Sequence, residues 1–384
     1  MSFEDSAEYI AKAKNLFTIG AAFTTNTSKG HDFFDISTHT LVALNTRTTG
    51  YSFLDKSLNG GYSNKTLVVL MGGPKTGKSM WLCNLAAQSV KNGYNTLYIT
   101  LELPYQKVSQ RIGANMFNIP MAQYNETVND TNLFSKKVQE FRANQLGKIG
   151  TFILEEFPTS TATAEMIEAF AIKKQEEISA LTGKDFKFDN VYIDYLNIMR
   201  DMKNPNSENT YLKIKSICED VRAMAQRNEW CVISVTQTNR GGTESSDLNM
   251  TDVSESAGLT ATVDALFGII RTTMMRAEGC YYLKAVAMRD SPLMGCKKRY
   301  TFNDTYLRLA EDLTEEIIAD GVDIPSIYVS ATANGVAKYQ QNNRGYNNQT
   351  PQQPAPIQQG TPLIQTPQLG ISESQLTGAD LFKM

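Results

Sequence analysis

An apolar segment, TLVVLM at 66–71, leads directly into GGPKTGKS at 72–79. The second segment fits the pattern G-x-x-x-x-G-K-[ST], in which backbone N–H groups wrap a phosphate and the lysine reaches the β- and γ-oxygens. A chance glycine-rich turn would not need a strand before it and a helix after it, and both are predicted here, the helix over about 80–90 with its positive end toward the phosphates. We predict a nucleoside triphosphate loop made by Gly72, Gly73, Pro74, Lys75, Thr76, Gly77, Lys78 and Ser79. In this pattern the hydroxyl of the last residue, Ser79, ligates Mg²⁺.

Further apolar runs at 96–101, 191–193 and 231–235 have the length and composition of buried parallel strands. Amphipathic stretches lie between them. The clearest spans 211–225, where apolar residues recur every three or four positions before the 231–235 run. Strand and helix alternation of this kind predicts an α/β fold, with a mainly parallel central sheet flanked by helices on both faces.

Composition divides the chain into three parts. Residues 1–47 combine a short amphipathic helix over 1–17 with a polar linker, and residues 48–329 form the α/β domain. Residues 330–384 are rich in Gln, Asn and Pro, and five of the twelve prolines lie between Pro351 and Pro367. Such a tail buries too little apolar surface to offset its ordering entropy, so we predict disorder. Its last segment, 372–384, regains apolar residues and suits either an inert end or a docking peptide.

Charge and cysteine content exclude several classes of function. The net charge is −3, so the broad basic surface of many nucleic-acid binders is absent, although local loops around a single strand need no such surface. Two histidines, His31 and His39, make a Cys/His zinc cluster or a histidine-based triad unexpected. The five cysteines are scattered singly, as is typical of reduced thiols in a cytoplasmic protein. No apolar run reaches the roughly 18–20 residues of a membrane span.

Two carboxylates follow predicted strands. Asp194 ends the strand VYID, where a carboxylate can hold Mg²⁺ beside Ser79, although an acid at a strand end is common. Glu102 follows the strand after the phosphate-loop helix and is a candidate for polarising the attacking water, or else a surface residue at a strand end.

Two further polar residues end strands. Gln237, in SVTQTNR, is placed to sense the γ-phosphate and to relay its loss to the long polar loop 238–258, which is otherwise a mobile surface loop. Arg289 follows an apolar strand over 281–286 and is a candidate arginine finger for a neighbouring subunit's ATP, or else a solvated arginine.

Together these segments resemble the ATPase domain of DnaB-type replicative DNA helicases, a RecA-like group of phosphate-loop NTPases. The resemblance covers most of 49–309 and is strongest to the form found in T-even phages. It is carried by the blocks TTGYSFLDKSLNGG (48–61), GGPKTGKS (72–79), LYITLELPYQKVSQRIGANM (97–116), VYIDYLNIM (191–199), SENTYLKIKSICEDVRAMA (207–225), SVTQTNRGG (234–242) and DLNMTDVSESAGLTATVDALFGIIR (247–271).

The resemblance implies a role for each matched position. Glu102 would be the water-activating base, Asp194 the Mg²⁺ acid, Gln237 the γ-phosphate sensor and Arg289 the finger supplied in trans. Lys78 would complete the catalytic set. DNA-binding residues would be Arg240, Glu255, Ser256 and Gly258, with a second channel loop around 202–208. The family hydrolyses ATP with Mg²⁺ around a homohexameric ring and moves 5′ to 3′ on single-stranded DNA.

Three departures from the family pattern keep other functions open. Ala287 stands where the family usually has a lysine, Ser254 stands where it often has an arginine, and only about 47 residues precede the motor. A RecA-like recombinase or mediator that forms filaments, and a non-catalytic ATP-binding scaffold, remain alternatives. Expected partners are single-stranded DNA and further copies of the chain, with primase, a helicase loader, single-strand-binding protein or a sliding clamp through the tail. The expected location is the cytoplasm of a bacterial or phage-infected cell, without a membrane.

Overall fold

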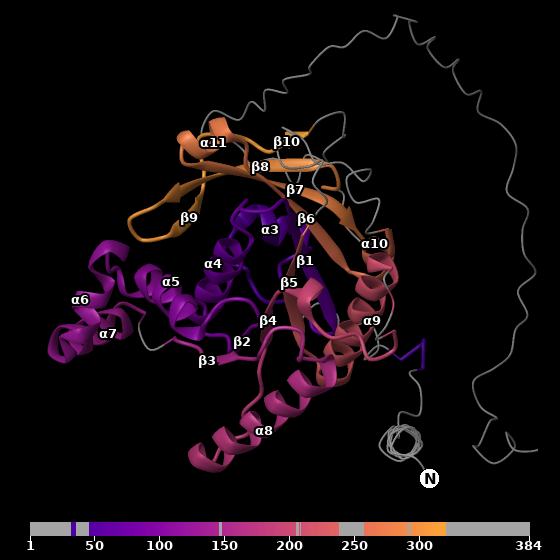
Figure 1. The fold of residues 1–384 in the computed structure, drawn as a ribbon, viewed down its shortest axis with the longest axis horizontal. Helices are drawn as coiled ribbons and strands as arrows, with labels where there is room; N and C mark the ends of the chain where they lie inside the picture. The colour runs from indigo at the N-terminus through magenta and orange to yellow at the C-terminus, as the bar shows by residue number, and fades with distance from the viewer. Residues whose placement is uncertain are drawn as a thin grey trace, which may run out of the picture. The chain divides into compact units, whose positions relative to one another are not determined.

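The computed structural model describes residues 32–35 and 46–319, except for 146–147, 205–206, 208, 238–256, 290 and 292. The helix predicted over 1–17 and the tail predicted over 330–384 lie outside the described residues. The predicted α/β domain is found in the described part, where one sheet runs through the centre with helices on both sides (Figure 1).

The sheet contains ten strands within the described residues, in the order β10-β8-β7-β6-β1-β5-β4-β2-β3, with β9 paired to β8. Six of them, from β6 to β3, run parallel, and the strands from β7 onward are antiparallel to their neighbours. The prediction of a mainly parallel central sheet is therefore confirmed, with an antiparallel extension at one side. The strands are β1 Thr66–Gly72, β2 Thr96–Thr100, β3 Phe152–Glu156, β4 Asn190–Asp194, β5 Cys231–Gln237, β6 Ala265–Ile270, β7 Cys280–Met288, β8 Cys296–Asn303, β9 Arg308–Glu311 and β10 Ile318–Ala319.

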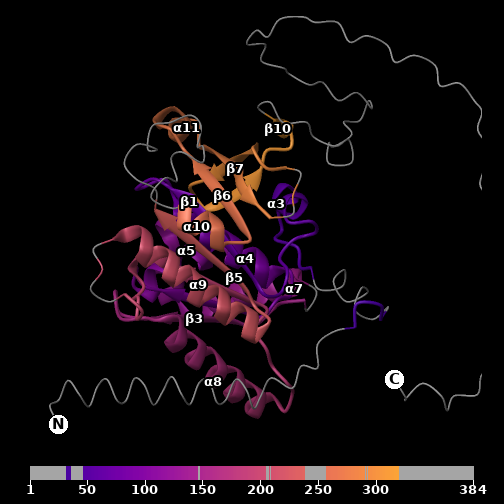
Figure 2. The same cartoon turned by 90° about the vertical axis from the view of Figure 1, so that its right-hand side faces the viewer.

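Helices cover both faces of the parallel part, and Figures 1 and 2 show α4 and α5 on one side and α8 and α9 on the other. The helix predicted over 211–225 is α9; it begins where the Asn209 side chain accepts the first free backbone N–H groups. The helices are α3 Ser52–Ser57, α4 Lys78–Lys91, α5 Tyr105–Phe117, α6 Tyr124–Asn129, α7 Thr131–Asn144, α8 Ala164–Thr182, α9 Thr210–Asn228, α10 Ala257–Thr262 and α11 Thr273–Ala277, with short 3-10 turns at Met121–Gln123 (η2) and Leu196–Ile198 (η3).

Strand β1 shows why the central strands are apolar throughout. Successive side chains of a strand point to opposite faces, and here both faces are covered. Val68 and Leu70 pack with residues of α4, whereas Leu67, Val69 and Met71 pack with residues of α8 and α9. The sheet therefore separates two hydrophobic cores, and its strand ends present the polar residues.

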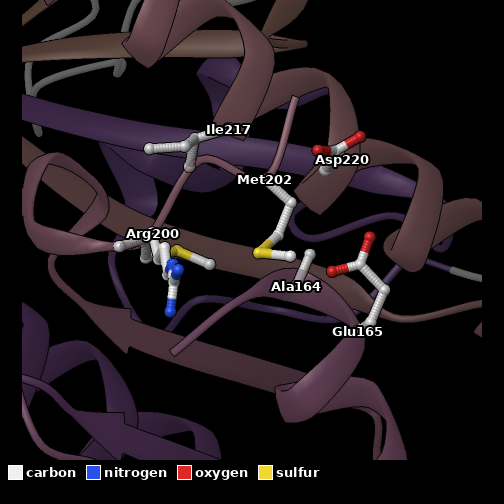
Figure 3. Close-up of a pocket in the computed structure, with 7 residues that line it drawn as sticks. Ala164, Glu165, Arg200, Met202, Ile217 and Asp220 are labelled. Carbon is white, nitrogen blue, oxygen red and sulfur yellow. The ribbon is translucent and has the colours of Figure 1, made fainter. Parts of the chain in front are cut away.

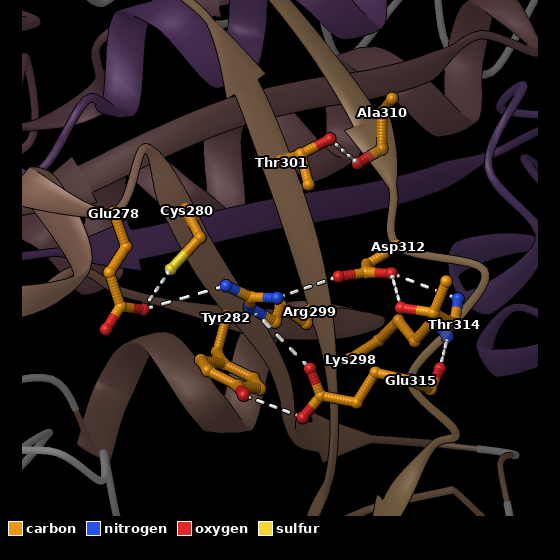
Figure 4. Close-up of polar contacts among 10 residues, drawn as sticks. All are labelled: Glu278, Cys280, Tyr282, Lys298, Arg299, Thr301, Ala310, Asp312, Thr314 and Glu315. Atoms are coloured by element: carbon orange, nitrogen blue, oxygen red, sulfur yellow. Dashed lines mark hydrogen bonds and ion pairs between the residues drawn. The ribbon is translucent and has the colours of Figure 1, made fainter.

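The antiparallel extension is joined to the segment after β9 by a polar cluster around Arg299 (Figure 4). The Arg299 guanidinium is 2.8 Å from Asp312, and longer ion pairs join it to Glu278 and Glu315. Tyr282 donates a hydrogen bond of 2.7 Å to Glu315. These contacts hold residues 312–315 against β7 and β8.

All five cysteines are free and buried, which confirms the prediction of reduced core thiols. Across the described part of the chain, no helix has both the length and the apolar character needed to cross a bilayer.

Candidate nucleotide-binding site

The predicted phosphate loop connects β1 to α4 and curls back on itself. Gly77 caps the helix with a φ of 94°, a left-handed conformation that favours glycine. The Lys78 ammonium donates a hydrogen bond of 2.9 Å to the Gly73 carbonyl, and the Thr76 hydroxyl donates one of 2.8 Å to the same oxygen. The lysine side chain therefore lies within the curve of the loop, close to where the pattern predicts phosphate.

Asp194 lies directly beside the start of α4. Its carboxylate is fully buried and accepts hydrogen bonds of 3.2 Å from the hydroxyls of Ser79 and Tyr98. Burial raises the pKa of Asp194 to about 6, and the charge of Glu102 also raises it, while the two hydroxyl bonds lower it. A buried carboxylate beside a hydroxyl is a set of hard oxygen donors, which fits Mg²⁺.

Glu102 lies on the same edge of the sheet. Thr100, the last residue of β2, pairs with Asp194, and Glu102 follows two residues later with an exposed side chain. Burial lowers the pKa of Lys78, and the negative charges of Glu102 and Asp194 act in the opposite direction. The two carboxylates and the lysine therefore share one electrostatic environment.

Gln237 is the last residue of β5 and pairs with Gly72, the first residue of the phosphate loop. Its backbone N–H donates a hydrogen bond of 3.2 Å to the Asn197 side chain, and its own side chain is exposed. The structure thus brings Lys78, Ser79, Glu102, Asp194 and Gln237 to the carboxyl ends of neighbouring parallel strands.

Arg289 is not part of this group. It follows β7, and its backbone N–H donates to the carbonyl of Asp264, which immediately precedes β6. Asp264 pairs through hydrogen bonds with Leu67 at the opposite end of β1 from the phosphate loop. Gly72 lies five residue steps along the strand from Leu67, a span of about 17 Å. Arg289 therefore lies at the other edge of the sheet from the site of its own chain.

Of the predicted DNA-binding residues, Gly258 lies in the first turn of α10, whereas Arg240, Glu255 and Ser256 lie outside the described residues. Of the predicted second channel loop, Met202 is exposed, and Lys203 forms an ion pair with Asp220.

The base of this second loop is tightly held. The buried Asp201 carboxylate accepts bonds from the backbone N–H groups of Lys203 and Asn204, and from the hydroxyl of Ser216 on α9. A small pocket lies beside it, and Figure 3 shows Arg200 on one side of Met202 with two carboxylates on the other. The pocket is lined by Ala164, Glu165, Met199, Arg200, Met202, Ile217 and Asp220.

Three residues near the phosphate loop were not predicted. Tyr98 donates to Asp194, and Arg276 on α11 donates a hydrogen bond of 3.0 Å to the Lys75 carbonyl. The Tyr281 hydroxyl lies so close to Gly77 that a Cβ there would stand 2.6 Å from it. Nothing in the sequence marks these residues, because a tyrosine within an apolar strand and an arginine on a short helix have many ordinary roles. Arg276 and Tyr281 contact the loop from about 200 positions further along the chain, whereas Tyr98 acts on Asp194.

Comparison with known proteins identifies related sequences. The family described as the DnaB-like helicase C-terminal domain matches residues 47–299. The DnaB-like replicative helicase of Enterobacteria phage T4 is 30% identical over 269 residues, which are 68% of this chain and 54% of that protein. The replicative DNA helicase DnaB of Rickettsia bellii is 24% identical over 289 residues, covering 71% and 52% of the two chains. The chain thus spans about half the length of these relatives.

Solved structures share the fold. One of them, described as an ATPase domain, superimposes with a TM-score of 0.57 at 16% identity, covering 78% of this chain and 97% of that one. A DnaB-like replicative helicase, whose structure was described together with its interactions with primase, has a TM-score of 0.57 at 17% identity and covers 76% and 66% of the two chains. These similarities show that the RecA-like ATPase fold is present.

Proposed function

Because the chain belongs to the family of DnaB-like helicase C-terminal domains, we propose that it is an ATP-driven replicative helicase that moves 5′ to 3′ along single-stranded DNA. The observation that carries the proposal is the grouping of Lys78, Ser79, Asp194, Glu102 and Gln237 at one edge of the sheet. Each of these side chains has a chemical part in hydrolysing a nucleoside triphosphate. A scaffold that only binds ATP would have no need of a water-activating carboxylate.

The phosphate loop and Lys78 bind the phosphates of ATP, with Ser79 and Asp194 as the proposed holders of Mg²⁺. Bound Mg²⁺ neutralises charge on the β- and γ-phosphates. Glu102 orients and polarises the attacking water, for which its exposed carboxylate beside Lys78 is suited. Gln237, next to Gly72, responds to loss of the γ-phosphate.

Arg289 completes the site of a neighbouring subunit. Its position at the opposite edge of the sheet supports this arrangement, since about 17 Å of strand separates it from the phosphate loop of its own chain. A closed ring, which we propose to be a homohexamer, brings the Arg289 edge of each subunit to the phosphate-loop edge of the next. In this proposal, loss of the γ-phosphate at Gln237 is coupled to a shift of the bound DNA strand.

We also propose protein partners for this chain. Primase is a proposed partner because a related helicase was described with it. Contacts with a loader, single-strand-binding protein or a sliding clamp through residues 372–384 are also proposals. Deleting 372–384 and measuring binding to each purified partner separates a docking peptide from an inert end.

The first test is strand displacement with ATP on a forked DNA, compared with duplexes that carry only a 5′ tail or only a 3′ tail. We expect unwinding that requires the 5′ tail and is absent from a Lys78→Ala control. Hydrolysis stimulated by DNA without unwinding would contradict the helicase function and favour a filament-forming motor. Electron microscopy would then distinguish closed rings from filaments.

A further inference from the structure

Asp264 lies at the junction of α10 and β6, and four groups converge on its carboxylate. Oδ2 accepts a hydrogen bond of 2.9 Å from the backbone N–H of Leu67 and one of 3.2 Å from Nε of Arg222. Oδ1 accepts one of 2.8 Å from Nη2 of Arg222 and lies 3.3 Å from Nε of Arg289. The carboxylate is therefore fixed by the backbone of β1 and by one close arginine, and it holds a second arginine less tightly.

The Arg289 guanidinium is attached by one edge. Nε donates to the Val263 carbonyl at 3.3 Å as well as facing Asp264, and Nη2 donates to the Ala261 carbonyl at 3.4 Å. A guanidinium has five N–H donors in a planar fork. Among the described residues, Nη1 has no hydrogen-bond partner, and the side chain is 45% exposed. The contacts of this guanidinium with the described residues therefore involve Nε and Nη2, and nearly half of the side chain is exposed.

We infer that Asp264 is the positioning residue for Arg289, holding the Nε side of the guanidinium so that the opposite side faces the γ-phosphate bound by the neighbouring subunit. This inference rests on the proposed function, in which Arg289 acts in trans. An arginine side chain loses rotamer freedom when it is fixed in one geometry. Contacts within its own subunit restrict the Arg289 side chain before it reaches the phosphate, so less rotamer freedom remains to be lost on binding. The distances of 3.3–3.4 Å are long enough for the guanidinium to adjust its position.

Arg222 offers a matched control because it shares the carboxylate but does not contact Arg289. Removing either charge breaks the 2.8 Å pair between Arg222 and Asp264. Only the loss of the Asp264 carboxylate releases Arg289. A residue that merely stabilised this corner of the fold would give the same kinetic result in both variants.

The experiment compares Asp264→Asn with Arg222→Gln in the full chain, by steady-state ATP hydrolysis with single-stranded DNA and by thermal unfolding. In Asp264→Asn, the remaining side-chain oxygen still accepts from Leu67, so the backbone of β1 keeps its bond. We expect kcat to fall about tenfold with KM for ATP changed less than twofold, because misorientation weakens a contact made in the transition state. Arg222→Gln, which breaks the same pair, is expected to keep kcat within twofold.

Two additional variants distinguish a failure of this inference from a folding defect and from a failure of the proposed function. Asp264→Glu keeps the charge but displaces the carboxylate by one methylene, and it is expected to lower kcat severalfold; full kcat in this variant overturns the inference. Adding Asp264→Asn to Arg289→Ala is expected to cause no further loss of kcat. Equal kcat in Asp264→Asn and Arg222→Gln, or higher kcat in Asp264→Asn than in wild type, also overturns it. Absence of hydrolysis by wild type, or full activity of Arg289→Ala, instead refutes the proposed function.

Discussion

Asp194→Asn is expected to make the nucleotide-free protein more stable at pH 7.5, although it removes the carboxylate proposed to hold Mg²⁺. Burial raises the pKa of Asp194 from 3.8 to about 6. The folded protein therefore binds this proton more tightly than the unfolded chain does. The contribution of Asp194 to the free energy of unfolding is complete below pH 3.8 and is lost as the pH rises through 6. This rise in pKa corresponds to about 3 kcal/mol in the free energy of unfolding.

The asparagine removes the buried charge and keeps both hydrogen bonds. Its side-chain oxygen and NH₂ group pair with the hydroxyls of Ser79 and Tyr98, each of which either donates or accepts. At pH 7.5 we expect up to about 3 kcal/mol of added stability, or roughly 6 °C in Tm for a domain of this size. The assay is thermal and urea unfolding in EDTA from pH 4.5 to 8. We expect the difference in the free energy of unfolding between variant and wild type to become smaller as the pH falls.

Asp201→Asn provides the opposite case at similar burial. Burial raises the pKa of Asp201, but hydrogen bonds from Asn204, Ser216 and two backbone N–H groups outweigh it and lower the pKa. Asp201→Asn is therefore expected to lose about 1–3 kcal/mol of stability at pH 7.5, because an NH₂ group replaces one of the oxygens that accept these hydrogen bonds. If Asp194→Asn is as stable as wild type or less stable at every pH, burial of the ionised carboxylate does not destabilise the folded protein, and the reasoning fails. With Mg²⁺ and ATP, wild type is expected to gain more stability than the variant.

Three further changes test other parts of the molecule. Lys78→Ala is expected to abolish ATP binding or turnover, measured with a fluorescent ATP analogue and by phosphate release; normal turnover would remove the lysine from the site. Glu102→Gln keeps the shape of the side chain without its charge, so ATP binding and DNA trapping should persist while hydrolysis falls by about 10²–10⁴. Normal hydrolysis in that variant would exclude Glu102 as the base. Arg299→Ala leaves the three carboxylates of Figure 4 without their shared cation and is expected to cost about 1–2 kcal/mol in urea unfolding, with ATP affinity unchanged.

Strands β1, β2, β4 and β5 of the parallel part were predicted because they are buried on both faces. Their sequences are short apolar runs ending in polar residues, as at Asp194 and Gln237. The sequence therefore indicates both the strand and the residue at which it ends. Strand β3 was not predicted, since it lies at the edge of the sheet and its sequence FILEE is only half-buried. Strand β8 carries the run CKKRYTFN, in which Arg299 is accommodated by ion pairs with residues outside the strand. Such partners are set by tertiary contacts and leave no local signal.

The direction of β7 determines at which edge of the sheet Arg289 lies. Strands β1, β4 and β5 run parallel, so the residues that follow them share an edge, and sequence order suffices to group them. Strand β7 runs antiparallel to β6, so Arg289, which follows it, lies at the edge where β1 begins. The sequence places Arg289 after a strand but does not specify that strand's direction. With the direction known, a single chain holds the phosphate loop at one edge and the arginine at the other. If Arg289 acts in trans as proposed, head-to-tail repetition of this unit would join the two edges, and only a closed ring would leave no site without its arginine.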